Sequence, residues 1–198
     1  MTDEVLEELI QTARQLGATE AAVISPDHIA IEKDLADLCG GDPRCPFYGF
    51  SVSCPPHVSG PEGFKEWQAQ SRHAIVYKID IPSSVLFSAE RREVGMLLHN
   101  IAAGIELKAK KMGYRGSRGF AGGSCKITFC NDFAECAMLS DPGECRNPES
   151  ARPSMSGFGV NVAKLMQTAG WPAKIAAPDE ASDESSMSWI AGLVLIIE

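Results

Sequence analysis

The chain has 198 residues, a hydrophobic fraction of 44% and a formal net charge of −8. This length suffices for a domain with a real core, and the acidic balance without a Lys/Arg cluster argues against a nucleic-acid partner. The acidic N-terminus lacks the apolar segment of a secretory signal, and the longest apolar run, residues 189–197, is too short to span a bilayer. We therefore expect a cytoplasmic protein with no membrane partner.

The first half of the sequence alternates helical and strand patterns. Residues 3–17 repeat apolar side chains at the spacing of an amphipathic helix. Two short strands are predicted at 21–25 and 28–32, separated by a turn. A helix over 61–72 and a strong strand over 74–81 close this half.

The second half repeats this order. A long helix is predicted over 84–112, followed by a short strand near 119–121. A helix over 156–169 and a strand over 173–177 come next, and the polar residues 178–186 are expected to form a surface loop. The final strand, 188–197, is continuously apolar, which predicts burial on both faces.

Together these patterns predict an α/β or α+β sandwich around a mixed sheet. Each half reads helix, strand, cysteine loop, helix, strand, so we expect two pseudo-duplicated halves, about 1–82 and 83–198. No long linker separates them, and the sequence is interpreted as one cysteine-rich domain, 1–198.

Cysteines are the most informative residues of this chain. A first thiol segment, residues 38–57, and a second thiol segment, residues 125–145, contain all seven. The candidate metal ligands are Cys39, Cys45, Cys54, Cys125, Cys130, Cys136 and Cys145. The last three cysteines of the second segment repeat the gaps of the first, five residues and then eight. In a reducing compartment an odd number of cysteines predicts metal or redox chemistry rather than a disulfide framework.

Multiple thiolates select iron–sulfur clusters, zinc or copper(I). A [4Fe–4S] cluster needs one thiolate for each iron, delivered by irregular loops, and the first thiol segment is rich in Gly and Pro. Cys125 completes a set of four in the second segment. The first segment has three, which leaves a fourth position for His57, water or a substrate. Zinc knuckles place two to four residues between ligands, and only the spacing from Cys125 to Cys130 fits that pattern.

Other residues give weaker signals. His57 is expected to be a hydrogen-bonding loop residue rather than a ligand, and Tyr48 lies near it in the first thiol segment. Four arginines surround the second thiol segment and are expected to offset the charge of thiolates and acidic residues. These are Arg115, Arg118, Arg146 and Arg152. No nucleotide-binding loop or zinc-protease motif is present.

The stretch from Cys45 through Tyr48-Gly49 to Cys54-Pro55-Pro56 resembles the signature of a prokaryotic family of predicted metal-binding proteins, domain of unknown function 2284. The second stretch, Gly123 to Met155, is also similar to that family. The resemblance covers roughly residues 30–176. It implies metal binding, with iron–sulfur chemistry in anaerobic or facultative prokaryotes.

Two functional classes follow. The protein is either an electron carrier holding two [4Fe–4S] clusters, or a small cluster-dependent reductase or activator that binds substrate at the three-cysteine site. The corresponding partners are a redox protein or a small-molecule substrate. A zinc-stabilised structural or interaction module is the alternative. The sequence carries no information on oligomeric state.

Overall fold

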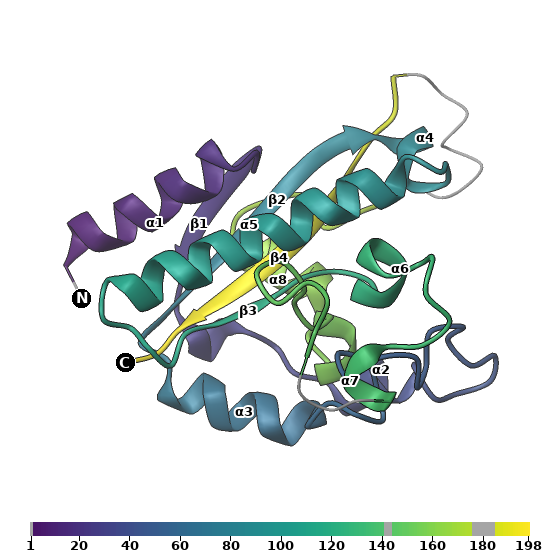
Figure 1. Ribbon diagram of the computed structural model, residues 1–198. Helices are drawn as coiled ribbons and strands as arrows, with labels where there is room; N and C mark the ends of the chain where they lie inside the picture. The colour runs from purple at the N-terminus through teal and green to yellow at the C-terminus, as the bar shows by residue number, and fades with distance from the viewer. Residues whose placement is uncertain (1, 141–143, 176–184) are drawn as a thin grey trace.

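The computed structural model describes residues 2–140, 144–175 and 185–198. In these residues an open four-stranded antiparallel sheet carries helices on both faces, an α+β arrangement (Figure 1). The strands are β1 (Glu20–Ile24), β2 (His73–Pro82), β3 (Arg118–Phe120) and β4 (Met187–Ile196). The α-helices are α1 (Asp3–Gln15), α2 (Lys33–Asp37), α3 (Gly60–Gln70), α4 (Ser83–Leu86), α5 (Arg91–Lys111), α6 (Cys125–Phe129), α7 (Ala137–Ser140) and α8 (Val162–Thr168). Two 3-10 helices are η1 (Pro26–His28) and η2 (Met155–Phe158).

The sheet has the strand order β1-β2-β4-β3. Strands β2 and β4 pair along their full lengths, from His73 opposite Ile196 to Pro82 opposite Met187. The apolar end of β4 is buried on both faces, as its sequence predicted. The expected mixed sheet is wrong, because every strand pair is antiparallel.

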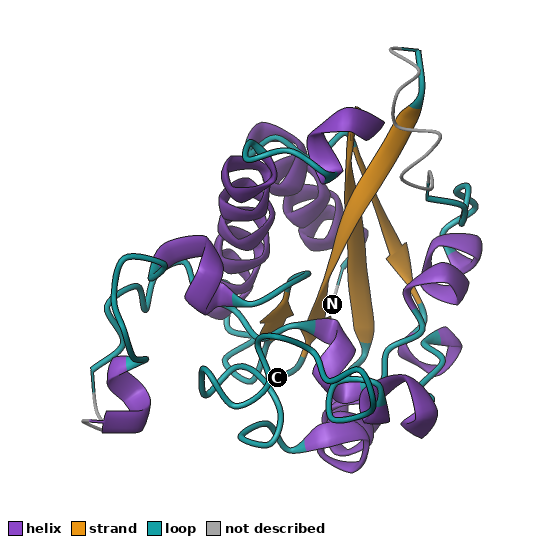
Figure 2. Cartoon of the chain, turned by 90° about the vertical axis from the view of Figure 1, so that its right-hand side faces the viewer, coloured by secondary structure: helices purple, strands orange, loops and turns teal. Residues whose placement is uncertain are grey.

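Helices cover both faces of the sheet, which Figure 2 shows nearly edge-on. On one face, α1 and α5 pack buried side chains such as Leu9 and Ile105 against Tyr77 and Val194 of the central strands. On the other face a second core gathers around Phe64 of α3 and includes residues of η2 and α8. Alternation of side chains along a strand explains this division, since adjacent residues of β2 and β4 enter opposite cores.

Two long predicted helices are each interrupted. The helix expected over 84–112 is two helices, α4 and α5, separated by residues 87–90. The helix expected over 156–169 is η2 followed by α8. Gly159 stands between these two with φ 73°, a left-handed conformation in which a helix cannot continue.

Two predicted strands are absent from the described residues. Residues 28–32 continue from η1 and form only an isolated bridge, between Ile31 and Val160. Residues 173–175 form no strand, and 176–177 lie outside the described residues, as does most of the loop predicted at 178–186. The proposed duplication of 1–82 and 83–198 is not confirmed by these elements. No helix in the described ranges is both long and apolar enough to cross a membrane.

Candidate metal centre

The two thiol segments meet through hydrogen bonds between their polar side chains. The first segment lies between α2 and α3, and the second begins with α6 and includes α7; Figure 1 shows both on the right-hand side of the molecule. Ser53 Oγ lies 2.9 Å from Cys125 Sγ, and Cys54 Sγ donates a hydrogen bond to Ser124 Oγ at 3.3 Å. Residues about 70 positions apart are therefore in direct contact.

Three thiols form the first group: Cys39, Cys45 and Cys54. The backbone N–H of Cys45 donates to the carbonyl of Cys39 at 3.2 Å, which folds the loop back on itself. Burial raises the pKa of Cys39, and the neighbouring charges of Cys45 and Cys54 raise it further. A cation bound here would offset the mutual repulsion of these thiolates.

Turns shape the rest of the first thiol segment. Gly49 N donates to the carbonyl of Pro55 at 2.8 Å, and His57 N donates to that of Cys54 at 3.0 Å. The Tyr48 ring packs against Gly40, where an added Cβ would lie 3.2 Å from the ring. The His57 side chain is exposed. The expectation that Tyr48 and His57 assist chemistry here stays a prediction.

All four thiols of the second group, Cys125, Cys130, Cys136 and Cys145, line one small cavity. Asn147 also lines it and contacts two of the sulfurs. Its side-chain Nδ2 donates to Cys130 Sγ at 3.3 Å, and its backbone N–H donates to Cys145 Sγ at 3.4 Å. N–H groups directed at sulfur stabilise thiolates, which are the form that binds metal.

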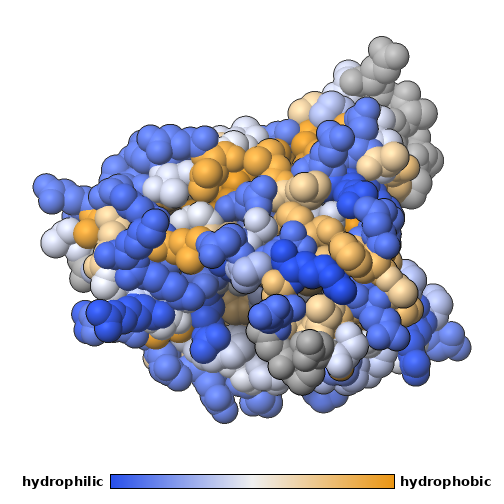
Figure 3. Space-filling model, viewed as in Figure 1, coloured by the Kyte–Doolittle hydropathy of each residue, from blue (hydrophilic) through white to orange (hydrophobic). Residues whose placement is uncertain are grey.

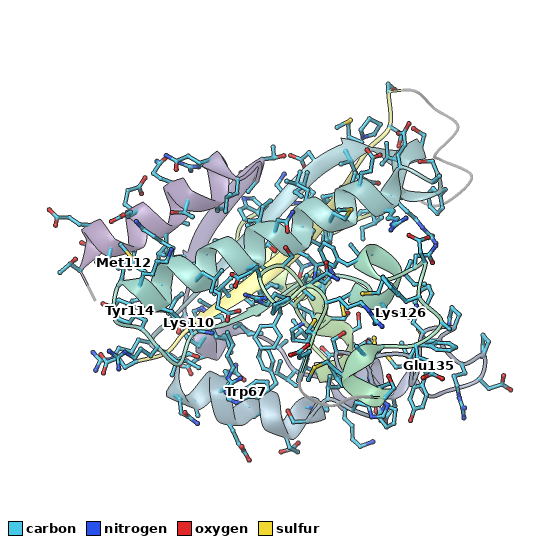
Figure 4. All side chains as sticks on the ribbon, viewed as in Figure 1. Trp67, Lys110, Met112, Tyr114, Lys126 and Glu135 are labelled. Atoms are coloured by element: carbon cyan, nitrogen blue, oxygen red, sulfur yellow. The ribbon has the colours of Figure 1, made fainter. Side chains whose placement is uncertain are left out.

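A buried lysine is hydrogen-bonded to the backbone of the second thiol segment. Lys126 Nζ donates to the carbonyls of Cys130 and Phe133 at 2.7 and 2.6 Å. Figure 4 shows Lys126 and Glu135 on the side of the molecule that carries α6 and α7. The lysine thus fixes the loop after α6 and places a positive charge beside thiols that become negative on metal binding.

Cys125 belongs to the second segment in sequence but contacts both groups in space. Burial is the main cause that raises its pKa to about 11, and neighbouring Cys54 and Cys136 act in the same direction. Hydrogen bonds from Ser53 and Ser51 lower the pKa and offset part of this shift. Cys125 therefore stands between the first and second groups.

The four arginines expected around the second segment have different surroundings. Arg146 lines the thiol cavity, and its guanidinium carbon lies 4.1 Å from the centre of the Phe133 ring. Arg152 is buried and pairs with Glu106 at 2.6 Å. Arg118 instead stacks on Trp67 at 4.3 Å. Of these three, Arg146 is the one placed to offset thiolate charge.

Sequence reasoning did not identify the polar residues around the thiols. Ser51, Ser53, Ser124 and Asn147 hydrogen-bond to a sulfur, and Lys126 bonds to the carbonyl of Cys130. The sequence signal that could have pointed to two of them is position, because Ser53 and Ser124 each immediately precede a cysteine.

Among the described residues, no three His, Cys, Asp or Glu side chains are placed to hold a single metal ion. The four cysteines of the second group are instead among the residues that line a cavity of about 20 Å³.

Residues 22–196 match the family described as Predicted metal-binding protein (DUF2284). Comparison with the curated proteins and with the solved structures finds no match.

Proposed function

This chain belongs to the DUF2284 family of predicted metal-binding proteins, and from that membership we propose that its cysteines bind two iron–sulfur clusters, one at each thiol group. The observation that carries the proposal is the cavity lined by all four thiols of the second group. The cavity has a volume of only about 20 Å³, so the support lies in the number of soft ligands, four, because a [4Fe–4S] cluster takes one thiolate for each iron. The sequence spacing agrees, since it lacks the paired knuckles typical of structural zinc.

The second group supplies a complete ligand set and suits electron transfer. Its thiols accept hydrogen bonds from Asn147, and N–H donors to sulfur raise a cluster's reduction potential because they stabilise the added negative charge. A cluster held there supplies one-electron chemistry. Cys125, Cys130, Cys136 and Cys145 hold it, and Lys126 keeps the loop after α6 in place.

The first group supplies three thiols, which leaves one position for a substrate. An open position at a metal is the arrangement that catalysis uses. This difference favours a small reductase or activator that receives electrons at the second group and uses them at the first. In a competing arrangement, Cys125 joins the first group, because it lies beside Cys54 as well as Cys136.

The two thiol segments are proposed to occupy equivalent positions of a duplicated unit. In support, β2 and β4 are the central strands and β1 and β3 the edges, so each half contributes one edge and one central strand. Helices α1 and α5 also end alike. Gly17 and Gly113 have φ of 110° and 101°, and Ala18 N and Tyr114 N each donate to a carbonyl five residues earlier.

The proposal includes a cytoplasmic setting and a redox protein or small-molecule substrate as partner. Its test is purification of the full chain under anaerobic conditions, with assays for iron, acid-labile sulfide and zinc. We expect brown protein with iron and sulfide in comparable amounts. Colourless protein with stoichiometric zinc contradicts the proposal and supports a zinc-stabilised structural or interaction module.

A further inference from the structure

A large cavity lies at the edge of β4, beyond the end of β3. Strand β3 pairs only with residues 193–195, so Ile190 and Ala191 have no strand on that side in the described residues. The cavity there has a volume of about 600 Å³, within the range of small-molecule sites. Residues of β4, α5 and α6 line it. Figure 3 shows hydrophobic residues at the surface on this right-hand side of the molecule.

The lining combines an apolar interior with two positive charges. Leu98, Ile127 and Trp189 are among its many apolar residues, and its described lining contains no Asp or Glu. Arg91 and Arg92 are the charged members. An occupant with an apolar body and a negative charge fits this lining, because its charge can pair with a guanidinium group while its body packs on the apolar residues.

The two arginines differ in their availability. Arg92 Nε donates to the carbonyl of Thr128 at 3.0 Å, and its terminal nitrogen lies 3.8 Å from Asp132. The Arg91 side chain makes no ion pair or hydrogen bond with any described residue. One free planar guanidinium fits one carboxylate through two parallel hydrogen bonds. A phosphate dianion would need a second free cation, and Arg92 is already engaged.

The cavity shares a wall with the first thiol group. Ser124 lines the cavity, and its hydroxyl lies 3.3 Å from the sulfur of Cys54. Phe47, two residues after Cys45, lines it as well. A molecule bound in the cavity is therefore separated from Cys54 by little more than the Ser124 side chain.

We propose that this cavity binds a small amphipathic organic acid. Its apolar body packs against Leu98 and Trp189, and its carboxylate pairs with Arg91. The idea that this acid is a substrate of the first thiol group rests on the proposed function. Binding of the acid in the cavity does not.

Calorimetry on the anaerobically purified full chain tests the charge requirement, with decanoate and decanol as probes below their aggregation concentrations. Arg91→Gln should weaken decanoate binding about tenfold, the effect of losing a charge-assisted pair, and leave decanol binding unchanged. Arg14→Gln is the matched control, because Arg14 is exposed on α1 and does not line the cavity. Equal decanoate affinity in Arg91→Gln and wild type overturns the proposal.

A second variant tests the cavity itself. Gly95 of α5 lines it, and an added Cβ would lie 3.5 Å from Thr128, an ordinary contact. Gly95→Leu fills the space with a better helix former, so binding should be lost without a fall in melting temperature, and Gly95→Ala should give an intermediate loss. Unchanged binding in a folded Gly95→Leu protein overturns the proposal.

Iron and sulfide assays on the same samples separate the two proposals. Iron and sulfide without decanoate binding overturn the organic-acid site alone. Binding that depends on Arg91 in protein without iron supports the site and contradicts the proposed function.

Discussion

The two thiol segments share their cysteine spacing but are held in the fold differently. The chain before the first segment is attached by partly exposed contacts, since Glu32 accepts from Asn161 Nδ2 at 2.8 Å and pairs with Lys164 of α8 at 2.9 Å. The chain after the second segment is attached by a buried ion pair, Arg152 with Glu106 of α5. Equal spacing of ligands therefore does not imply equal environments. The cysteines of the second group line one small cavity, and the first group lies beside a large ligand-sized cavity.

The largest expected effect comes from removing a thiol of the second group. Cys136→Ser or Cys145→Ser should lower soluble yield and reduce stability by about 5 kcal/mol, or roughly 10–20 °C in melting temperature, because the loop that carries these thiols depends on bound metal for its order. Thermal unfolding and metal analysis of anaerobic samples measure this. Ser140→Ala, in the exposed last position of α7, is the control. Unchanged stability and metal content in both cysteine variants would falsify a ligand role for this loop.

The next largest effect is the loss of stability when the ion pair of Glu106 is broken, compared with the loss when the contacts of Glu32 are broken. Glu106 accepts from Arg152 Nε at 2.6 Å and from Gly119 N at 2.8 Å, and it also pairs with Lys110. Glu106→Gln should cost about 3 kcal/mol, since it leaves Arg152 buried without a counter-charge. Glu32→Gln, at the exposed attachment of the first segment, should cost much less. Urea unfolding of both variants measures the two losses of stability. Equal losses would contradict the claim that the two segments are held differently.

Acidification should weaken the attachment of the second segment. His99 is fully buried, its Nδ1 accepts the backbone N–H of Arg152 at 3.1 Å, and its Nε2 has no partner among the described residues. Burial, aided by the charge of Arg152, lowers the pKa of His99 to about 4. Above the unfolded-state pKa of about 6.5 the stability from neutral His99 is fully present, and it is lost as pH falls from about 6.5 to 4.

Urea unfolding at pH 7 and pH 5 measures this contribution. Wild type should lose about 2 kcal/mol through His99 over that interval. His99→Gln keeps a polar group but cannot titrate. Between pH 7 and pH 5 its free energy of unfolding should therefore fall by about 2 kcal/mol less than that of wild type. Parallel pH dependence of the two proteins rules out His99 as the titrating group.

The smallest effect concerns the hydroxyls between the segments. Ser53→Ala removes the contact to Cys125, and Ser124→Ala removes the one to Cys54. A lost hydrogen bond worth about 1 kcal/mol should lower a one-electron reduction potential by about 40 mV. Redox titration of the two variants should show a shift in different clusters, the second for Ser53→Ala and the first for Ser124→Ala. A shift of the first cluster in both variants would instead place Cys125 in the first group.

Local patterns predicted much of the fold. The bounds of α1, α3, β2 and β4 were predicted to within two residues from local signals: apolar periodicity for α1, a proline in the first turn for α3, and strand-forming or continuously apolar residues for β2 and β4. The family and its metal-binding class were also predicted correctly, and of the two fold classes left open, α/β and α+β, the structure has the second. The break at Gly159 was missed because it depends on a distant contact, since the Gly159 carbonyl accepts the N–H of Glu32 at 2.8 Å.

The candidate site shows the same limit of sequence reasoning. Spacing identified the seven thiols, but it could not show that Cys125 lies beside Ser53 and Cys54. That neighbour relation arises only when residues far apart in the chain are packed together. The cavity next to Ser124 was missed for the same reason, because its walls come from α5, α6 and β4.

Electron paramagnetic resonance on reduced, anaerobic protein tests the central claim that each thiol group holds its own cluster. Wild type should give two signals. Cys45→Ser should remove or alter one, and Cys130→Ser the other. Only the signal that depends on Cys45 should change when cyanide is added, because only the first group leaves a coordination position free. A single signal that is lost in either variant would contradict two separate clusters.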